Sequence, residues 1–162
     1  MALIATLGGT DSNSYVTVVE AGLYFDNHVY ASAWATVPNA EATLIYAATL
    51  LDTLVNFFGL KETLTQSMEW PRILPTTSDY DGIIPKQIKN AQCELALYLL
   101  SNDSVIDQES LSKLSLGPIK LDFNVDTIWQ SLPPIVTAMV SGFGQIRSTN
   151  SGAVSNVALI RS

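Results

Sequence analysis

The sequence is poor in the side chains that most often perform catalysis or bind metal ions. Among its 162 residues there is one cysteine, Cys93, and one histidine, His28. A single cysteine cannot form an intrachain disulfide, and the apolar pattern 92-QCELALYLL-100 favours a buried thiol over a nucleophile. A catalytic nucleophile needs a positioned base, and a zinc site needs several histidine or cysteine ligands. The sequence therefore predicts no catalytic residue, no metal site, no cofactor and no enzymatic activity.

Positive charge is also scarce. Eight lysines and arginines stand against fifteen acidic residues, so the formal net charge is −7. Because binding to free nucleic acid depends mainly on contacts between basic side chains and phosphates, this balance disfavours a stand-alone DNA-binding protein. Every acidic residue lies at or before Asp126, whereas Arg147 and Arg161 have no acidic neighbour in the last segment. The chain therefore reads as an acidic body with a mildly basic end.

Long apolar runs and a basic leader are missing as well. No stretch reaches the ~18 apolar residues of a membrane span, and the N-terminus does not have the pattern of a signal peptide. We therefore expect a soluble protein that is made in a reducing compartment and does not enter a membrane. Hydrophobic residues still make up 48% of the chain and charged residues only 14%. This composition suits one well-filled domain that buries much of its surface against partners.

Apolar periodicity predicts a mainly α-helical domain, a small helical bundle. Helices are expected over residues 17–28, 39–59, 85–101 and 133–143. Thr17 and Glu20 form a capping-box pattern at the start of the first helix. Asn39 can cap the second helix, and Gly59 is a natural stop for it. Alternating apolar residues over 113–123 indicate a short β-hairpin or a bent edge strand.

The end of the chain differs from this bundle. Residues 145–162 are rich in Ser, Asn and Gly and close with the apolar patch VALI. Such a segment cannot offset its ordering entropy alone. We expect a helical domain at residues 1–144 and an extended, flexible C-terminal arm at residues 145–162 that becomes ordered on a partner. The arm side chains expected at that interface are Arg147, Val154, Val157, Leu159, Ile160 and Arg161.

The most distinctive short motif is Glu69-Trp70-Pro71-Arg72, which joins two expected helices. Trp70 offers a large apolar area to the core, and Pro71 stiffens the connection. Arg72 can form forked hydrogen bonds to Glu69, to Glu94 or to a carboxylate of a neighbouring subunit. We interpret the motif as scaffold in preference to a DNA contact, and the family resemblance described below implies that it extends into a subunit interface.

A single-strand binding surface would combine aromatic and basic side chains. The nearest approaches are Trp70 with Arg72, and Lys86 with Lys89 at the start of the third long helix. A solvated helix face explains the two lysines better, because the first turn of a helix is where cations are least favoured.

Several segments in order carry a resemblance to a known family. They are 12-SNSYVTVVEAGLYF-25, Trp34, 47-AATLLD-52, 67-SMEWPR-72, 83-IIPKQIKNAQCELALYLL-100 and 117-GPIKLDF-123. From about residue 12 to residue 143 the chain resembles the head-to-tail adaptor (connector or neck) proteins of tailed phages. Some of these relatives carry the name of DnaT-like single-stranded-DNA-binding proteins. The segment after Gly144 is longer and more polar than in the relatives.

This resemblance implies a structural role in the virion. Such proteins form a homo-oligomeric ring, commonly twelvefold, beneath the portal protein, and a downstream neck or tail protein docks below. Double-stranded DNA passes through the ring without specific binding. The implied location is the neck between head and tail, after synthesis in the host bacterial cytoplasm, and the arm residues would contact the portal or neck partner. The alternative is a single-stranded-DNA-binding protein of a phage replication system.

Overall fold

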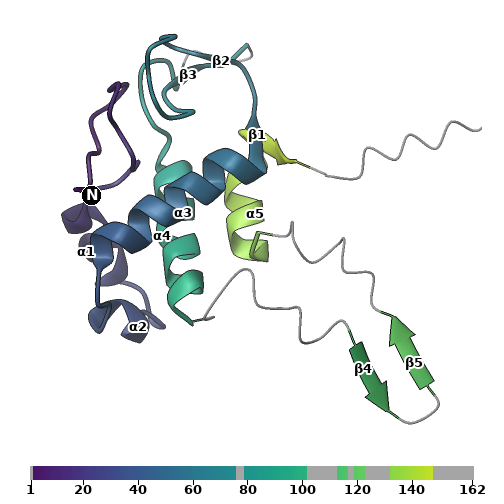
Figure 1. Cartoon of the computed structure of the whole chain (residues 1–162). Helices are drawn as coiled ribbons and strands as arrows, with labels where there is room; N and C mark the ends of the chain where they lie inside the picture. Colours follow the sequence, from purple (N-terminus) through teal and green to yellow (C-terminus); the bar gives the residue numbers. More distant parts are fainter. Residues whose placement is uncertain (1, 76–78, 102–112, 117–118, 123–131, 148–162) are drawn as a thin grey trace, which may run out of the picture.

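The computed structural model describes residues 2–75, 79–101, 113–116, 119–122 and 132–147. Its elements in chain order are α1 (Val18–Phe25), α2 (Ser32–Ala35), α3 (Ala40–Leu54), β1 (Val55–Phe57), β2 (Leu60–Lys61), β3 (Arg72–Ile73), α4 (Lys86–Ser101), β4 (Lys113–Leu116), β5 (Ile119–Asp122), α5 (Pro134–Val140) and β6 (Gly144–Ile146). Figure 1 shows α1 and α2 near the start of α3, and the β2–β3 pair beyond its end.

The described chain is a small mixed α/β domain, and the prediction of a mainly helical bundle is correct only in part. Among the described residues, antiparallel two-stranded sheets join β1 with β6, β2 with β3, and β4 with β5. The predicted hairpin within 113–123 is the β4–β5 pair. The other strands have two or three residues each, which is too short for alternation to reveal them in the sequence.

The local signals for helix starts are confirmed. The Glu20 N–H donates to the Thr17 hydroxyl at 3.1 Å, and the Thr17 N–H donates to the Glu20 carboxylate at 2.8 Å. These reciprocal bonds form the capping box of α1. At α3, the Ala42 N–H donates to the Asn39 side-chain oxygen at 3.0 Å. Both caps satisfy backbone donors that a helix leaves free in its first turn.

The predicted end of the second helix is wrong. Helix α3 stops at Leu54, and the chain continues as β1, which pairs with β6. Gly59 lies in the turn between β1 and β2, where its φ is +75°. A Cβ at this position would lie 2.1 Å from the carbonyl oxygen of Ile73. Glycine is therefore required for the close approach of the turn to β3, and not for ending a helix.

The core lies where α3, α4 and α5 pack together. Its fully buried side chains include Leu44 and Leu51 from α3, Ile88 and Leu95 from α4, and Val136 from α5. Burying a side chain of this size stabilises the fold by roughly 1.5–3 kcal/mol. No helix within the described ranges is long and apolar enough to cross a bilayer.

A buried glutamine ties the N-terminal segment to this core. Gln92 is fully buried on α4. Its side-chain oxygen accepts from the Tyr15 N–H at 2.9 Å, and its amide donates to the Leu44 carbonyl at 2.9 Å and to the Ser14 hydroxyl at 2.7 Å. One side chain thus links three segments, and its own buried oxygen and amide nitrogen are satisfied.

The beginning of the predicted arm takes part in the domain. Gln145 and Ile146 belong to β6 and stand opposite Asn56 and Val55 of β1. Arg147 follows with its N–H donating to the Leu54 carbonyl at 2.7 Å. Residues 148–162 lie outside the described residues.

Candidate functional site

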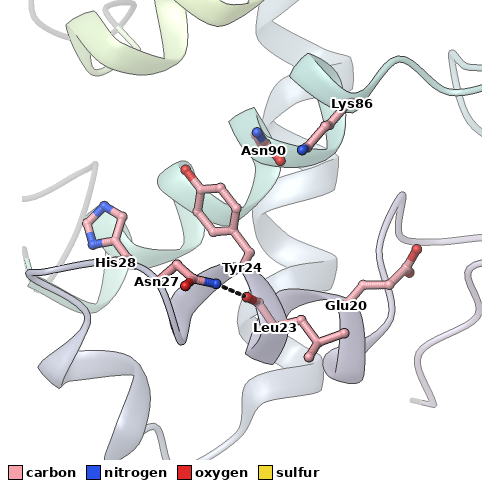
Figure 2. Close-up of a pocket in the computed structure, with 7 residues that line it drawn as sticks. All are labelled: Glu20, Leu23, Tyr24, Asn27, His28, Lys86 and Asn90. Carbon is pink, nitrogen blue, oxygen red and sulfur yellow. Dashed lines mark hydrogen bonds between the residues drawn. The ribbon is translucent and has the colours of Figure 1, made fainter.

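A cleft of about 430 Å³ lies between α1 and the first turns of α4. Figure 2 shows the side chains that line it, which come from both helices and from the turn after α1. They are Glu20, Leu23, Tyr24, Asn27, His28, Lys86 and Asn90. The volume falls within the range of small-ligand sites. The lining offers an aromatic ring, two carboxamides and a cation.

The Glu20 carboxylate at one wall is already engaged. One oxygen accepts from Lys89 Nζ at 2.7 Å, and the other accepts from the N–H and the hydroxyl of Thr17. Burial raises the pKa of Glu20, but the hydrogen bonds from Lys89 and Thr17 outweigh it, so the pKa is lowered overall. Glu20 therefore fixes the start of α1 and links it to α4.

Tyr24 and His28 converge on a buried carboxylate behind the cleft. The Tyr24 hydroxyl donates to Glu94 Oε1, and His28 Nε2 lies 3.1 Å from the same oxygen. His28 Nδ1 accepts from the Tyr30 N–H at 3.2 Å, so the ring proton is placed on Nε2. Burial and the bond to Glu94 raise the pKa of Tyr24. The hydroxyl of Tyr24 is thus used internally, and its ring remains as a wall of the cleft.

Lys86 is the cation of the opposite wall. It is the first residue of α4, and Asn90 follows one turn later on the same side. Lys86 has no ion-pair partner among the described residues. An anion beside Lys86 would also lie near a helix N-terminus, where the backbone N–H groups favour negative charge.

Other basic side chains are held in ion pairs. Lys61 and Arg72 lie 3.3 Å and 2.6 Å from the Glu69 carboxylate, and Lys89 binds Glu20. Among the basic residues whose side chains the structure describes, this leaves Lys86 and the exposed Arg147 without an acidic partner. The described surface therefore offers few free cations for phosphates.

The motif at residues 69–72 is built into the scaffold. Trp70 is 1% exposed, and its ring packs edge-on against Phe57 and Phe143 at centroid distances of 5.9 Å and 5.7 Å. Such edge-to-face contacts add to the stabilisation from burial. Trp70 is held between β1 and the end of α5, and no part of its ring is free to stack on a ligand.

Arg72 uses its guanidinium group entirely within the domain. Nε donates to the Phe58 carbonyl at 2.8 Å, and Nη2 donates to the carbonyls of Phe57 and Gly59 at 3.2 Å and 2.7 Å. Nη1 donates to the backbone and the carboxylate of Glu69 at 3.2 Å and 2.6 Å. These five bonds match the five N–H donors of an arginine. Of the carboxylates considered from the sequence, Glu69 is the one contacted, and a role in a subunit interface stays a prediction.

Two further titratable groups are buried away from the cleft. Asp52 accepts from the Tyr15 hydroxyl and from the Glu69 N–H, and burial raises its pKa to about 6. Burial, reinforced by Glu94, raises the pKa of Cys93 to about 12. Cys93 is 2% exposed, so its side chain is buried as the sequence predicted. With the raised pKa, its thiol stays protonated near neutral pH. Among the described residues no group of three or more His, Cys, Asp and Glu could hold a metal ion.

The residues predicted for the arm interface do not form a described site. Arg147 is exposed beside the end of α3, and Val154, Val157, Leu159, Ile160 and Arg161 lie outside the described residues. The sequence suggests that Lys86 and Lys89 form a solvated pair. In the structure Lys86 lines the cleft, whereas Lys89 binds Glu20. The sequence does not reveal the cleft, because about sixty residues separate α1 from α4 and no periodic pattern indicates their contact.

The chain belongs to the family described as "putative DnaT-like ssDNA binding protein", whose model matches residues 1–162. No curated protein and no solved structure matches it significantly. The part of the sequence resemblance that points to a head-to-tail adaptor stays a prediction.

Proposed function

We propose that this protein binds single-stranded DNA and that the cleft between α1 and α4 takes part in the contact. The proposal draws on the description of the family, whose model covers residues 1–162. The observation that carries it is the position of Lys86, a cation without an ion-pair partner among the described residues, in a cleft also lined by the Tyr24 ring and two asparagines.

The groups of the cleft suit a nucleotide of an unpaired strand. A base can stack on the ring of Tyr24, and such stacking contributes about 1–3 kcal/mol per base. The carboxamides of Asn27 and Asn90 can each donate to and accept from a base edge. Lys86 can then contact the adjoining phosphate. A duplex hides its base faces, so the proposal requires a preference for single strands.

The charge of the protein limits the strength of this binding. The formal net charge is −7, and Lys61, Arg72 and Lys89 are held in ion pairs. Each phosphate neutralised on a single strand contributes a slope of about −0.7 in log K against log salt. With Lys86 as the main contact of the cleft, the slope should be shallow and the affinity of one site modest.

Binding of fluorescent oligonucleotides to the purified chain tests the proposal. Anisotropy would be followed at several salt concentrations with a thymidine oligonucleotide and with a duplex of equal length. Lys86→Glu should abolish most of the binding, whereas Lys61→Glu introduces the same charge change at β2, outside the cleft, and should retain it. Absence of binding even at low salt, equal binding of the duplex, or equal losses in both variants would refute the assignment.

A structural head-to-tail adaptor is the second candidate, and the charge pattern favours it. A protein with a net charge of −7, in which Lys61, Arg72 and Lys89 are held in ion pairs, repels phosphates, and such a wall lets duplex DNA slide through a channel without sticking. In this proposal the protein forms a ring in the virion neck, with the portal protein and a downstream neck or tail protein as partners.

Co-sedimentation with a purified portal ring tests this candidate. The deletion used for the arm should remove residues 148–162, because a deletion from residue 145 would also remove two residues of β6 that pair with β1. Saturable binding near one subunit per portal subunit supports the adaptor. If the variant that lacks residues 148–162 loses this binding, the contact with the portal is made by the arm. An absence of portal binding together with salt-sensitive oligonucleotide binding decides for the first candidate.

A further inference from the structure

An ion pair lies at one edge of the cleft between α1 and α4. Lys89 Nζ on α4 donates to Glu20 Oε1 on α1 at 2.7 Å, and the two side chains are 33% and 43% exposed. Figure 2 shows Glu20 on the α1 side of the cleft, and Lys86 with Asn90 on the α4 side. Lys89 stands between Lys86 and Asn90 in the chain, but unlike them it does not line the cleft.

The ion pair therefore draws one of two neighbouring lysines out of the cleft. Lys86 and Lys89 are three residues apart on α4, so they are neighbours on one side of the helix. A lysine carries its charge on a flexible stem of four carbons. Because Lys89 binds an oxygen of a residue that itself lines the cleft, its ammonium group can reach the cleft once Glu20 no longer holds it.

The Glu20 carboxylate is held in place independently of Lys89. Its second oxygen accepts from the Thr17 N–H at 2.8 Å and from the Thr17 hydroxyl at 3.0 Å, within the capping box of α1. Burial raises the pKa of Glu20, but the hydrogen bonds from Lys89 and Thr17 outweigh it and lower the pKa overall. A fixed negative charge thus stands beside the cleft at neutral pH.

We propose that Glu20 takes the place of a strand phosphate on Lys89 and so limits the affinity of the cleft for single-stranded DNA, a role that rests on the DNA binding proposed above. A carboxylate and a phosphate accept the same kind of charge-assisted hydrogen bond from a lysine. If Lys89 turned to a phosphate, Glu20 would remain at the capping box as an unpaired like charge beside the strand. Its repulsion would offset the new contact, so the wild-type cleft uses Lys86 and leaves Lys89 with Glu20.

Removing the charge of Glu20 should therefore strengthen DNA binding by one phosphate contact. The variant Glu20→Gln is suited to this test, because glutamine also serves at the third position of a capping box. One further phosphate contact on a single strand makes the slope of log K against log salt steeper by about 0.7. Measured from equal affinity at about 1 M salt, this slope corresponds to a gain of about fivefold at about 0.1 M and about 25-fold at about 0.01 M.

Oligonucleotide anisotropy over a range of salt concentrations, with the full chain and a thymidine oligonucleotide, measures this gain. Glu41→Gln is the matched control, because Glu41 lies in the first turn of α3, outside the cleft lining, and loses the same charge. The double variant Glu20→Gln/Lys89→Gln has the net charge of the wild type and lacks the freed lysine, so its slope should return to the wild-type value. Circular dichroism would verify folding, and Glu20→Ala is a second variant that removes the same charge.

The expected pattern separates a freed lysine from a general change in charge. Affinity and slope should rise in Glu20→Gln, and they should rise neither in the double variant nor, to the same extent, in Glu41→Gln. A wild type that binds with the same slope as Glu20→Gln overturns the role of Glu20. Equal gains in Glu20→Gln and Glu41→Gln, or a gain that persists in the double variant, overturn it as well. An absence of binding in the wild type and in every variant refutes the DNA binding itself.

Discussion

Replacing Asp52 by asparagine should change how the free energy of unfolding depends on pH. The Asp52 carboxylate lies in α3 and accepts from the Tyr15 hydroxyl and, at 3.2 Å, from the Glu69 N–H. Burial raises its pKa from 3.8 to about 6, although both hydrogen bonds act in the opposite direction. The folded protein therefore holds this proton more tightly than the unfolded chain does.

The size and sign of the effect follow from linkage. Between the unfolded and the folded pKa, the native state binds more protons, so stability falls as the pH rises through this window. A shift from 3.8 to about 6 corresponds to about 3 kcal/mol at 1.36 kcal/mol per unit, most of it between about pH 4 and pH 7. The amide of Asp52→Asn does not titrate. The stability of the variant relative to the wild type should therefore rise by about 2–3 kcal/mol over this range.

Urea unfolding of both proteins at closely spaced pH values measures this difference. Subtracting the two curves removes the contributions of all titrating groups that the proteins share. Tyr15→Phe provides a second variant, because loss of the hydroxyl donor should raise the pKa of Asp52 further and move the fall in stability to higher pH. Parallel curves for Asp52→Asn and the wild type would show that the carboxylate is not held in the buried state described.

Three further outcomes can be measured. Arg72→Lys should lower the free energy of unfolding in urea by about 3 kcal/mol or more, because an ammonium cannot replace the fork that bonds Glu69 and the carbonyls of the β1–β2 turn. A loss below 1 kcal/mol would contradict that role. Gly59→Ala should cost at least about 1–3 kcal/mol in the same assay, because its φ is +75° and a Cβ would collide with the Ile73 carbonyl. The Cys93 thiol, buried and with its pKa raised to about 12, should react with a disulfide reagent at pH 8 only as the protein unfolds, and rapid labelling of the native protein would refute this.

The helix starts show how far local chemistry reaches. The sequence predicts the start of α1 from Thr17 and Glu20 and the start of α3 from Asn39. These predictions succeed because a capping bond joins residues only three apart in the chain. The apolar stripe of α4 likewise predicts its place in the core. The end of α3 was mispredicted, because the residues that turn Val55–Phe57 into a strand belong to β6, almost ninety positions later.

The sequence reveals only single residues of the candidate cleft. Lys86 and His28 stand out by residue type, but their separation along the chain gives no sign that α1 packs beside the start of α4. The link is made by Lys89 with Glu20 and by Glu94 with Tyr24 and His28. Such contacts between distant residues leave no periodic trace in one sequence.

The sequence by itself determined the main helices, their caps and the burial of Cys93, because these depend on residue types and on short-range spacing. Its composition also showed that strong binding to phosphates is disfavoured. Only the tertiary structure decided that Arg72 makes its hydrogen bonds inside the domain, and that Val19 and Leu23 face outward. It also decided that Lys86 lies at the cleft with Tyr24 and has no ion-pair partner in the part of the chain that the structure describes. Each of these depends on which distant segment covers a side chain, and that is settled by packing.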